Sequence, residues 1–598
     1  MKILPEWIRS YRKPWLAGDM VAGAIVTVML IPQSLAYALL AGLPPQMGLY
    51  ASILPIVAYA WLGSSMTLAV GPVAVASLMT ASALQPLATA GSPEYVALAM
   101  LLALLSGGML LVFGALRLGF LAHFLSHPVI SGFISGSAIL IAVGQLRHLL
   151  GVKAGGTHAL DSLVNLAHAL PHTNLTTLAL GGGSLLFLWV ARRFLAQWLI
   201  RAGLGDKAAE LIAKLAPMLA VLVSTALVAW LQLDRSAGVS VVGPVPQGLP
   251  AIGMPAIDVG MVSQLWLPAL LISLVGFVES VSVAQSLALR RQQRIQPNHE
   301  LLGLGAANVA SALSGGFPVT GGFARSVVNF AAGANTPLAG VIAAALMAVV
   351  LAGFTGLFHD LPHAVLAATI IVAVVSLIDL QTLREAWRYD KADALALIAT
   401  AGGVIGFGVE AGILVGVALS LGTLVWRSSH PHIAVIGRVP GTQHFRNVAR
   451  HAVQTQPGLA ALRVDENLFF ANAGVLQDTV EAQLAQQPDA RHVLLVFSAV
   501  NQVDVTALGV LSEMERSLRQ RGVGLLLAEV KGPVWDRLRN TELGQRMAGR
   551  VFLSTHEAFD WARSEQTARK AAAAIIAEDV QTTARLKLSP GATGGDPA

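Results

Sequence analysis

Long apolar stretches recur between residues 19 and 427 of the 598-residue chain. A helix needs about 20 mostly apolar residues to cross the hydrocarbon layer of a bilayer. Nine stretches approach or exceed this length, at 19–41, 93–116, 126–147, 174–196, 214–232, 266–289, 336–358, 363–379 and 391–408. Shorter stretches, or stretches broken by Gly and Pro, lie at 48–62, 71–87, 299–314, 322–333 and 410–426. The pattern predicts a polytopic α-helical membrane protein with about fourteen crossings, some of them incomplete.

Basic residues between these stretches indicate their orientation. If the N-terminus is cytoplasmic, the cytoplasmic ends of the even-numbered crossings carry Arg117, Arg192, Arg193, Arg290, Arg291, Arg294, Arg384, Arg388, Lys391 and Arg427. The opposite loops are poor in basic residues, with Arg147, Lys153 and Arg235 as the main exceptions. This distribution follows the positive-inside rule, so we expect a multi-pass protein of the plasma (inner) membrane with both termini in the cytoplasm.

The hydropathy pattern changes after the membrane region. Residues 432–565 alternate short apolar runs with amphipathic helices, with strands expected at 459–464, 492–497, 524–529 and 551–553. This alternation predicts a small cytoplasmic α/β domain. The remaining divisions are an interfacial segment at 1–18, a transmembrane domain at 19–427, and an Ala-rich and then Gly/Pro-rich tail at 566–598. We expect the tail to be a frayed helix followed by disorder.

Composition narrows the class of protein further. Charged residues make up 12% of the chain and hydrophobic residues 55%, which excludes a disordered chain and a wholly soluble globule. Cysteine is absent, so no disulfide or thiolate metal site is expected. The net charge of the chain is +6. Its basic residues lie between the apolar runs, a distribution that fits membrane topology better than nucleic-acid binding. No nucleotide-binding loop, catalytic triad signature or HExxH motif occurs, so we expect neither an enzyme, nor an ATP-driven pump, nor a cofactor.

Two similar interruptions, one in each half of the membrane region, are the most informative feature. Each of the segments 67–77 and 315–327 has an extended stretch with Gly and Pro and then a short helix. Unwound backbone at membrane depth is tolerated only where protein or a water-filled cavity satisfies it. Such a pair predicts an inverted repeat with an anion site where the two helix N-termini converge, with Arg325 in the first turn of the second helix. The alternative is that these residues merely kink two helices.

Glu279 is a second outlier, because a carboxylate in an apolar helix must be protonated, ion-bound or paired. It shares a helical stripe with Gly276, Ser282 and Ser286, opposite Val and Leu. The sequence therefore makes it a protonatable coupling group, a wall of the substrate site, or the structural partner of a nearby Arg. Gln33 and Tyr37 are neighbours on the first span, where they donate either to a bound oxyanion or to another helix.

These segments resemble the SulP family of anion transporters, the solute-carrier-26 group. The motifs that carry the resemblance are 31–37 (IPQSLAY), 44–50 (PPQMGLY), 70–72 (VGP), 132–136 (GFISG), 145–146 (QL), 278–280 (VES), 317–322 (FPVTGG) and 325–326 (RS). The segment 501–509 (NQVDVTALG) is similar to the loop-to-helix motif of STAS domains. The resemblance implies a seven-plus-seven inverted repeat with a core and a gate domain, a substrate site between the half-helical third and tenth spans, and a homodimer.

The resemblance also implies specific site residues. They are Gln33 and Tyr37 on the first span, Val73 and Ala74 as backbone donors on the third, Glu279 on the eighth, and Phe323, Ala324 and Arg325 on the tenth. Many relatives have Ser at the position of Ala324, so one hydroxyl contact is lost here. Val283 stands where a sodium-coupled bicarbonate relative has Thr, which argues against a sodium site. In the STAS-like motif, Thr506 is a phosphorylation position in some anti-sigma antagonists, but helix capping by Asp504 or Thr506 is the simpler interpretation.

Together these features predict a secondary transporter of small inorganic oxyanions, with sulfate as first choice and proton symport as the mechanism. Transport of dicarboxylate or bicarbonate, a passive anion channel, and a membrane-anchored regulatory protein are the alternatives. The expected partners are the anion, protons, membrane lipid, a second copy of the chain and a cytoplasmic partner of the STAS domain. No metal site and no nucleic acid are expected.

Overall fold

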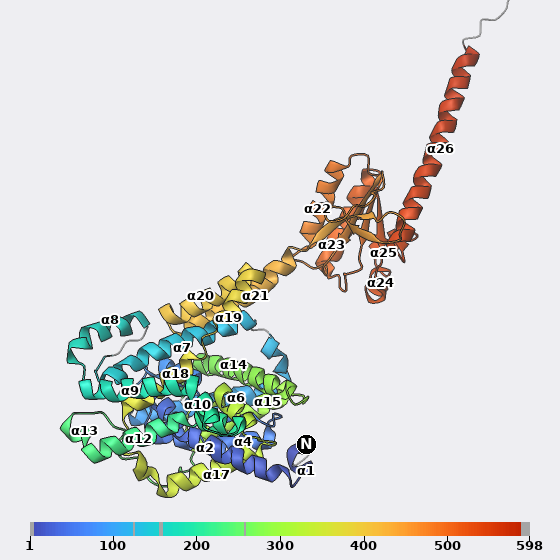
Figure 1. Ribbon diagram of the computed structural model, residues 1–598. Helices are drawn as coiled ribbons and strands as arrows, with labels where there is room; N and C mark the ends of the chain where they lie inside the picture. Colours follow the sequence, from blue (N-terminus) through green and yellow to red (C-terminus); the bar gives the residue numbers. More distant parts are fainter. Residues whose placement is uncertain (1–4, 124–125, 155–158, 256–258, 588–598) are drawn as a thin grey trace, which may run out of the picture. The chain divides into compact units, whose positions relative to one another are not determined.

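The computed structural model describes residues 5–123, 126–154, 159–255 and 259–587. The chain divides into two compact units, Met1–Leu421 and Gly422–Ala598. The first unit is helical apart from two short strands, and the second contains a six-stranded sheet (Figure 1).

The first unit contains fourteen apolar segments in the order that the hydropathy pattern predicts. The first seven are α2 (Trp15–Leu40), α3 with α4 (Pro45–Tyr50 and Leu54–Leu62), β1 with α5 (Val70–Gly71 and Ala74–Leu84), α6 (Pro93–Ala115), α7 (His127–Leu150), α9 (Leu175–Val190) and α12 (Ala216–Leu231). The second seven are α14 (Val259–Leu289), α15 (Pro297–Leu313), β2 with α16 (Thr320–Gly321 and Phe323–Ala331), α17 (Leu338–Gly353), α18 (His363–Val375), α20 (Lys391–Phe407) and α21 (Val409–Ser429). Among the described residues, seven helices are long and apolar enough to cross a bilayer by length and composition, and the others are shorter or broken.

Short elements connect these segments. They are α1 (Glu6–Arg9), η1 (Leu118–His123), α8 (Ala159–Ala169), η2 (Leu170–His172), η3 (Ala191–Leu195), α10 (Ala196–Arg201), α11 (Asp206–Lys214), α13 (Leu233–Ser236), η4 (Thr355–Phe358) and α19 (Leu380–Tyr389). Helix α2 begins four residues before the predicted start of the first span, directly after Pro14. Proline there is compatible with a helix start, because the missing N–H would have no partner in the first turn.

Packing between the helices has the symmetry of an inverted repeat. Helix α2 packs on α17, and its counterpart in the second half, α14, packs on α6. In the same way α7 packs on α20 while α18 packs on α9, and the counterparts α4 and α15 pack on each other. Close approach depends on glycine: a Cβ on Gly107 of α6 would lie 2.8 Å from the Gly305 carbonyl oxygen of α15. Small residues are what allow helix backbones to touch in a membrane.

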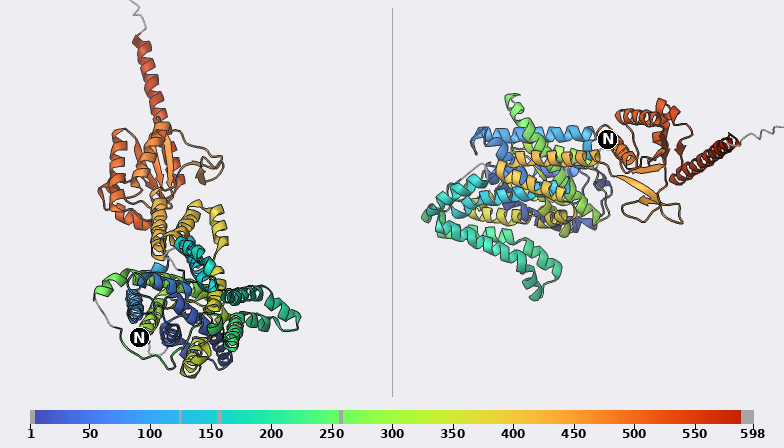
Figure 2. Two further views of the ribbon diagram at one scale, coloured as in Figure 1. Left: turned by 90° about the vertical axis from the view of Figure 1, so that its left-hand side faces the viewer. Right: turned by 90° about the horizontal axis from the view of Figure 1, so that it is seen from above.

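The second unit is an α/β domain with strand order β4-β3-β5-β6-β7-β8. The strands are β3 (Ile433–Arg438), β4 (Phe445–Asn447), β5 (Leu459–Val464), β6 (His492–Val496), β7 (Gly524–Ala528) and β8 (Val551–Phe552), of which β5 to β8 are parallel. One apolar cluster joins this sheet to α22 (Ala473–Gln486), α23 (Val505–Gln520) and α25 (Glu542–Arg546). Another joins it to the start of α26 (Thr555–Lys587), so helices cover both faces (Figure 2). The short helix α24 (Gly532–Leu538) follows β7.

Two features of this unit differ from the expectation. Strands β3 and β4 were not among the predicted strands. Both lie at one edge of the sheet, where the strands pair antiparallel. Helix α26 continues unbroken to Lys587, so residues 566–587 form a regular helix where a frayed helix was expected. Alanine has the highest helix propensity, which accounts for a helix that outlasts its packing against the sheet. Residues 588–598, the remainder of the predicted tail, lie outside the described residues.

Candidate substrate site at the crossing of two broken helices

The two interruptions meet in space. Strands β1 and β2 pair antiparallel, with Val70 opposite Gly321 and Gly71 opposite Thr320. Helix α5 begins three residues after Gly71 and α16 begins two residues after Gly321, each after an extended N-cap residue. The first N–H groups of a helix have no partner within it and carry the positive end of the helix dipole. The crossing therefore brings two short helix N-termini to one place.

Hydroxyl and amide side chains from neighbouring helices hold β2 in this position. Ser280 of α14 accepts a hydrogen bond from the Gly321 N–H at 2.9 Å, and its hydroxyl lies 2.8 Å from that of Thr320. The side-chain amide of Asn308 on α15 bonds both the N–H and the carbonyl of Val319, each at 2.9 Å. Backbone that has left a helix inside a membrane must find such partners, because water does not supply them.

Helix α16 holds the other strand. The Ser326 hydroxyl accepts from the Ala69 N–H at 2.9 Å, and the Asn329 side chain donates to the Thr67 carbonyl at 3.0 Å. The segments 67–71 and 320–329 therefore form one hydrogen-bonded body although about 250 residues separate them in sequence. Movement of one half-helix must carry the other with it.

Arg325 lies directly against the crossing and is 2% exposed. A Cβ on Gly71 would lie 3.0 Å from its Nη1, and a Cβ on Gly322 would lie 3.1 Å from its Nη2. A side chain at either position would press on the guanidinium, which would have to shift by a few tenths of an ångström. Among the described residues, neither terminal nitrogen has a hydrogen-bond partner, and no ion pair links Arg325 to a carboxylate within 4.0 Å. A buried, unpaired cation is costly, so the geometry favours an anion as its partner.

Three predicted site residues line one large cavity beside the crossing. Gln33, Tyr37 and Ala324 border about 1340 Å³ of empty volume between α2 and α16 on one side and α9 to α12 and α18 on the other. Tyr37 interacts electrostatically with Arg325. Val73 and Ala74 are buried at the crossing itself, at 7% and 5% exposure, and do not line the cavity.

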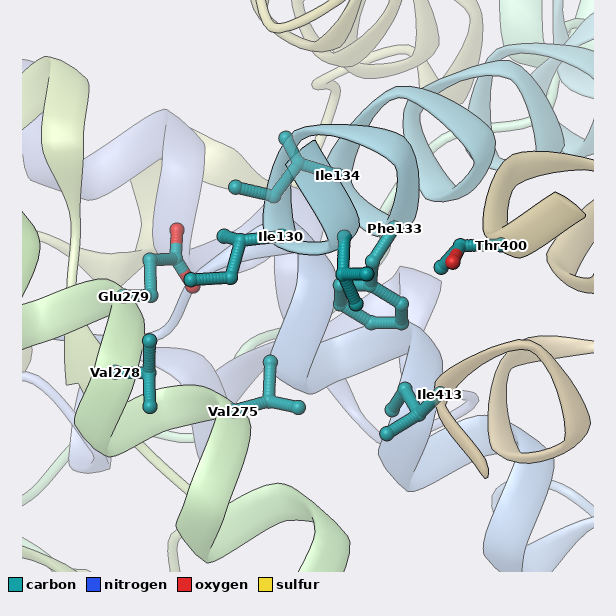
Figure 3. A pocket seen from close by; sticks show the side chains of 9 residues that line it. Ile130, Phe133, Ile134, Val275, Val278, Glu279, Thr400 and Ile413 are labelled. Atoms are coloured by element: carbon teal, nitrogen blue, oxygen red, sulfur yellow. The ribbon is translucent and has the colours of Figure 1, made fainter. Parts of the chain in front are cut away.

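Phe323 and Glu279 do not border the large cavity. Phe323 is 49% exposed at the start of α16 and is not among the residues that border the large cavity. Glu279 borders a smaller and mostly apolar cavity of about 370 Å³, between α14 and helices α7, α20 and α21. Figure 3 shows its carboxylate pointing toward Ile130 and Ile134 of α7. Glu279 interacts electrostatically with Arg325 but forms no ion pair with it within 4.0 Å.

The two cavities are counterparts under the inverted repeat. Helices α2, α9, α12 and α18 border the large cavity, and their counterparts α14, α20, α21 and α7 border the small one. No group of three His, Asp or Glu side chains suited to a metal ion occurs among the described residues.

Comparison with known proteins decides the family. Residues 16–400 match the sulfate permease family and residues 450–558 match the STAS domain. The chain belongs to the sulfate permease family. It is 36% identical over 537 residues to "Probable sulfate transporter Rv1739c" of Mycobacterium tuberculosis, with 90% of this chain and 93% of that protein covered. It is 34% identical to chloroplastic sulfate transporter 4.1 of Arabidopsis thaliana, with coverage of 88% and 76%.

Solved structures confirm the predicted fold of this chain. The murine Solute Carrier 26 family member A9 anion transporter superimposes with a TM-score of 0.86 at 22% identity and covers 94% of each chain. The transmembrane domain of the cyanobacterial bicarbonate transporter BicA gives a TM-score of 0.57 at 23% identity, covering 69% of this chain and 98% of that domain. The seven-plus-seven fold followed by a STAS domain is thereby confirmed. The family match and the curated relatives show that the protein is a transporter rather than an enzyme.

Sequence reasoning missed several polar residues of this permease's large cavity: Arg192, Glu210, Thr369 and Ser376. Arg192 entered the argument only as a topology signal, but it lies in the π-helical turn η3 and its Nη1 donates to the Val372 carbonyl at 3.0 Å. Such turns inside α-helices often mark functional positions. Thr369 of α18 and Ser376, the C-cap residue of that helix, are seven residues apart, a spacing that places both on one helical face and was visible in the sequence.

Two buried carboxylates that the sequence did not single out anchor the broken segments. Glu300 of α15 is 0% exposed and accepts hydrogen bonds from the Tyr59 hydroxyl, the Ser64 N–H and hydroxyl, and the Ser65 N–H at 2.6 to 3.0 Å. It thereby fixes the loop that leads into β1. Asp19 of α2 does the same for the loop after α16, accepting from the backbone N–H groups of Asn335 and Thr336 and from the Thr336 hydroxyl.

Replacing Glu300 with glutamine should lower the stability of the membrane unit. The amide nitrogen donates where the carboxylate oxygen accepts, so at least one buried donor loses its partner, at a cost of about 2–3 kcal/mol. We expect a clearly lower midpoint of thermal unfolding in detergent, monitored by intrinsic tryptophan fluorescence. Tyr59→Phe is the matched control, because it removes one donor without creating a repulsive contact and should cost less. Equal midpoints for Glu300→Gln and the parent would show that this carboxylate does not anchor the loop.

Proposed function

We propose that this sulfate permease carries sulfate across the plasma membrane by proton symport. The observation that carries the proposal is the buried, unpaired guanidinium of Arg325 at the point where two helix N-termini converge. Converging N–H groups and a guanidinium favour an oxyanion, because both donate hydrogen bonds and both contribute positive potential. Relatives named sulfate transporters, at 34% to 36% identity over most of the chain, support sulfate as the substrate.

We propose that Gln33, Tyr37, Val73, Ala74, Phe323, Ala324 and Arg325 form the substrate site. Gln33 and Tyr37 supply side-chain donors from α2, and the early residues of α5 and α16 supply backbone donors. Ala324 contributes no hydroxyl, so selection between sulfate, dicarboxylate and bicarbonate depends on charge and size more than on directed hydrogen bonds. Val283, one turn after Glu279, offers no oxygen ligand, which favours a proton over sodium as the coupling ion.

The direct test is an uptake competition panel in proteoliposomes that contain the full chain. Labelled sulfate uptake is measured with an imposed inward proton gradient, with and without excess unlabelled sulfate, succinate or bicarbonate. We expect sulfate to compete best and the proton gradient to drive accumulation above equilibrium. Stronger competition by a dicarboxylate or bicarbonate would reassign the substrate. Uptake that never exceeds electrochemical equilibrium would indicate a passive anion channel.

We also propose a topology in which both termini and the STAS domain lie in the cytoplasm. Arg192 at the mouth of the large cavity follows the positive-inside distribution, so this cavity opens toward the cytoplasm in the proposed orientation. We further propose a homodimer, and a STAS domain that adjusts transport or assembly through a cytoplasmic partner. At the STAS loop, the Asp504 carboxylate caps α23 by accepting from the Ala507 N–H at 2.7 Å, while Thr506 is exposed.

Deleting residues 432–598 should leave substrate binding intact. The membrane unit contains all the proposed site residues and its own apolar core, so it should retain its fold without the second unit. We expect labelled sulfate to bind the purified truncation with near-parental affinity, while the rate of uptake or the oligomeric state changes. A monodisperse truncation that binds no sulfate would contradict this independence.

A further inference from the structure

A third cavity of the membrane unit is not explained by the proposed substrate site. It has about 810 Å³ of empty volume between the ends of α2 and α5 and helices α7 and α8. Its polar lining residues are Ser82, Gln85, Gln145, Arg147, His148 and Ser162. The lining includes no Asp or Glu, so the cavity carries positive charge that its own walls do not balance.

This cavity lies on the other side of the crossing from the large cavity. Along α2, Gln33 and Tyr37 border the large cavity and the next turn, Leu39 and Leu40, borders this one. Along α5, the N-terminus forms the crossing, and the far end, through Gln85, borders this cavity. The helix has 11 residues, so about 16 Å separates its two ends. The large cavity and this third cavity therefore form two approaches to the site at the crossing.

Arg147 supplies the charge in this outer cavity. Its Nε donates to Nε2 of His148 at 3.2 Å and its Nη1 donates to the Ala154 carbonyl at 3.4 Å. Because Nε2 of His148 accepts this bond, the histidine is neutral there and leaves the Arg147 charge unopposed. No carboxylate lies within 4.0 Å of Arg147 in the described part of the chain. The topology rule did not explain this residue either, since it is one of the few basic residues outside the cytoplasmic loops.

A purely structural role for Arg147 is to satisfy the end of α7. The last carbonyls of a helix attract cationic side chains. Here the guanidinium donates to Ala154, which lies beyond the helix, and the helix end is closed instead by Gly151 in a left-handed conformation, whose N–H donates to the Arg147 carbonyl. The Arg147 side chain therefore does not bond the last carbonyls of α7. It is directed toward the cavity instead.

We propose that this cavity is an outer anion site, where Arg147 and the amides of Gln85 and Gln145 hold a divalent oxyanion before it reaches the crossing. The inference rests on the proposed function, because the bound species is the transported anion and the cavity faces the outside only in the proposed orientation. The site raises the local concentration of the anion at the mouth of the path, as charged funnels do in other proteins. It accounts for a basic residue on the side of the membrane where such residues are rare.

Chemical protection tests the site without relying on transport. The full chain in detergent is treated with phenylglyoxal, which modifies accessible arginines, and modification is measured residue by residue by mass spectrometry. We expect sodium sulfate, but not sodium gluconate of equal ionic strength, to slow modification of Arg147 several-fold. Arg235 is the internal control, because it is exposed, belongs to the same predicted side and lies outside the cavity. Equal protection of both arginines, or protection of neither, would overturn the proposal.

Kinetics in intact cells tests whether the site serves uptake. Arg147→Gln should raise the apparent KM for external sulfate by about twofold to fivefold, the size expected for one solvent-exposed charge, and should leave the maximal rate unchanged. Lys153→Gln, which removes the same charge six residues away outside the cavity lining, should leave KM unchanged. The same KM change in both variants would indicate a general surface potential, and a lower maximal rate without a KM change would indicate a structural role. Either result would overturn the proposal.

The outer anion site and the proposed function can be tested independently of each other. Protection of Arg147 by sulfate should persist in Arg325→Ala, which lacks the charge of the inner site. If the parent protein does not take up sulfate, the proposed function fails, while the protection experiment still decides whether an outer anion site exists. If Arg147→Gln is poorly expressed, Arg147→Lys keeps the charge and should retain near-parental KM.

Discussion

Arg325→Ala should abolish sulfate uptake or raise its apparent KM by about tenfold to a hundredfold, while the protein still reaches the membrane folded. The guanidinium is the only charged group that lies directly against the crossing among the described residues, and charge-assisted hydrogen bonds contribute about 1.5–3 kcal/mol each. Folding should survive, because removing an unpaired buried charge relieves a desolvation cost. Labelled sulfate binding to purified protein and uptake into proteoliposomes provide the measurement.

Two variants separate the charge from its packing. Arg325→Lys keeps a cation on a shorter reach and should retain part of the binding, whereas Arg325→Met fills much of the same space and should behave like alanine. Arg291 is a matched control, because its guanidinium also packs on α16, 4.5 Å from the Phe330 ring and bonded to the Ala334 carbonyl, but away from the crossing. Arg291→Ala should therefore leave KM unchanged. Parental uptake kinetics in Arg325→Ala would remove Arg325 from the substrate site.

The order of the membrane crossings was predictable from the sequence because a membrane restricts the backbone conformations that a chain can adopt. Backbone groups in lipid must be satisfied within a helix, so the apolar stretches marked the crossings and the Gly/Pro interruptions marked where helices end at membrane depth. What the local pattern did not contain was the pairing itself. Nothing within the segments 67–77 or 315–327 specifies that Val70 lies opposite Gly321, because this register depends on Ser280 and Asn308 from two other helices.

The candidate site shows the same limit. A helical stripe predicts which residues share a face, but not which neighbouring helix that face meets. Gln33, Tyr37 and Ala324 meet at one cavity, whereas Glu279 borders a different one. The sequence did not indicate that Glu300 and Asp19 are buried. An acid near the end of an apolar stretch gives the same sequence pattern whether its side chain is solvated or buried. Their partners are backbone N–H groups of distant loops.

The separation of Glu279 from Arg325 gives a physical reason for coupling the anion to a proton. Without a substrate, the Arg325 charge is balanced only at a distance by Glu279. A divalent anion at the crossing over-compensates Arg325, and the carboxylate then stands as a further negative charge in an apolar cavity, where ions are poorly solvated. Binding a proton to Glu279 removes this cost. Anion and proton should therefore bind cooperatively, and the loaded site carries less net charge when it moves between the two sides.

Glu279→Gln holds the side chain in its neutral form and should uncouple these two events. We expect the variant to retain sulfate counterflow when no gradient is imposed, because the anion still meets Arg325 and the helix N-termini. We expect it to lose accumulation driven by an inward proton gradient, and to lose the stimulation of uptake that we predict for the parent as the external pH falls. Glu410→Gln is the matched control, since Glu410 is another acid of the membrane unit, at the start of α21, that does not line either cavity. If Glu279→Gln accumulates sulfate under the gradient as the parent does, Glu279 is not the coupling residue, and the carboxylate then serves only to balance Arg325.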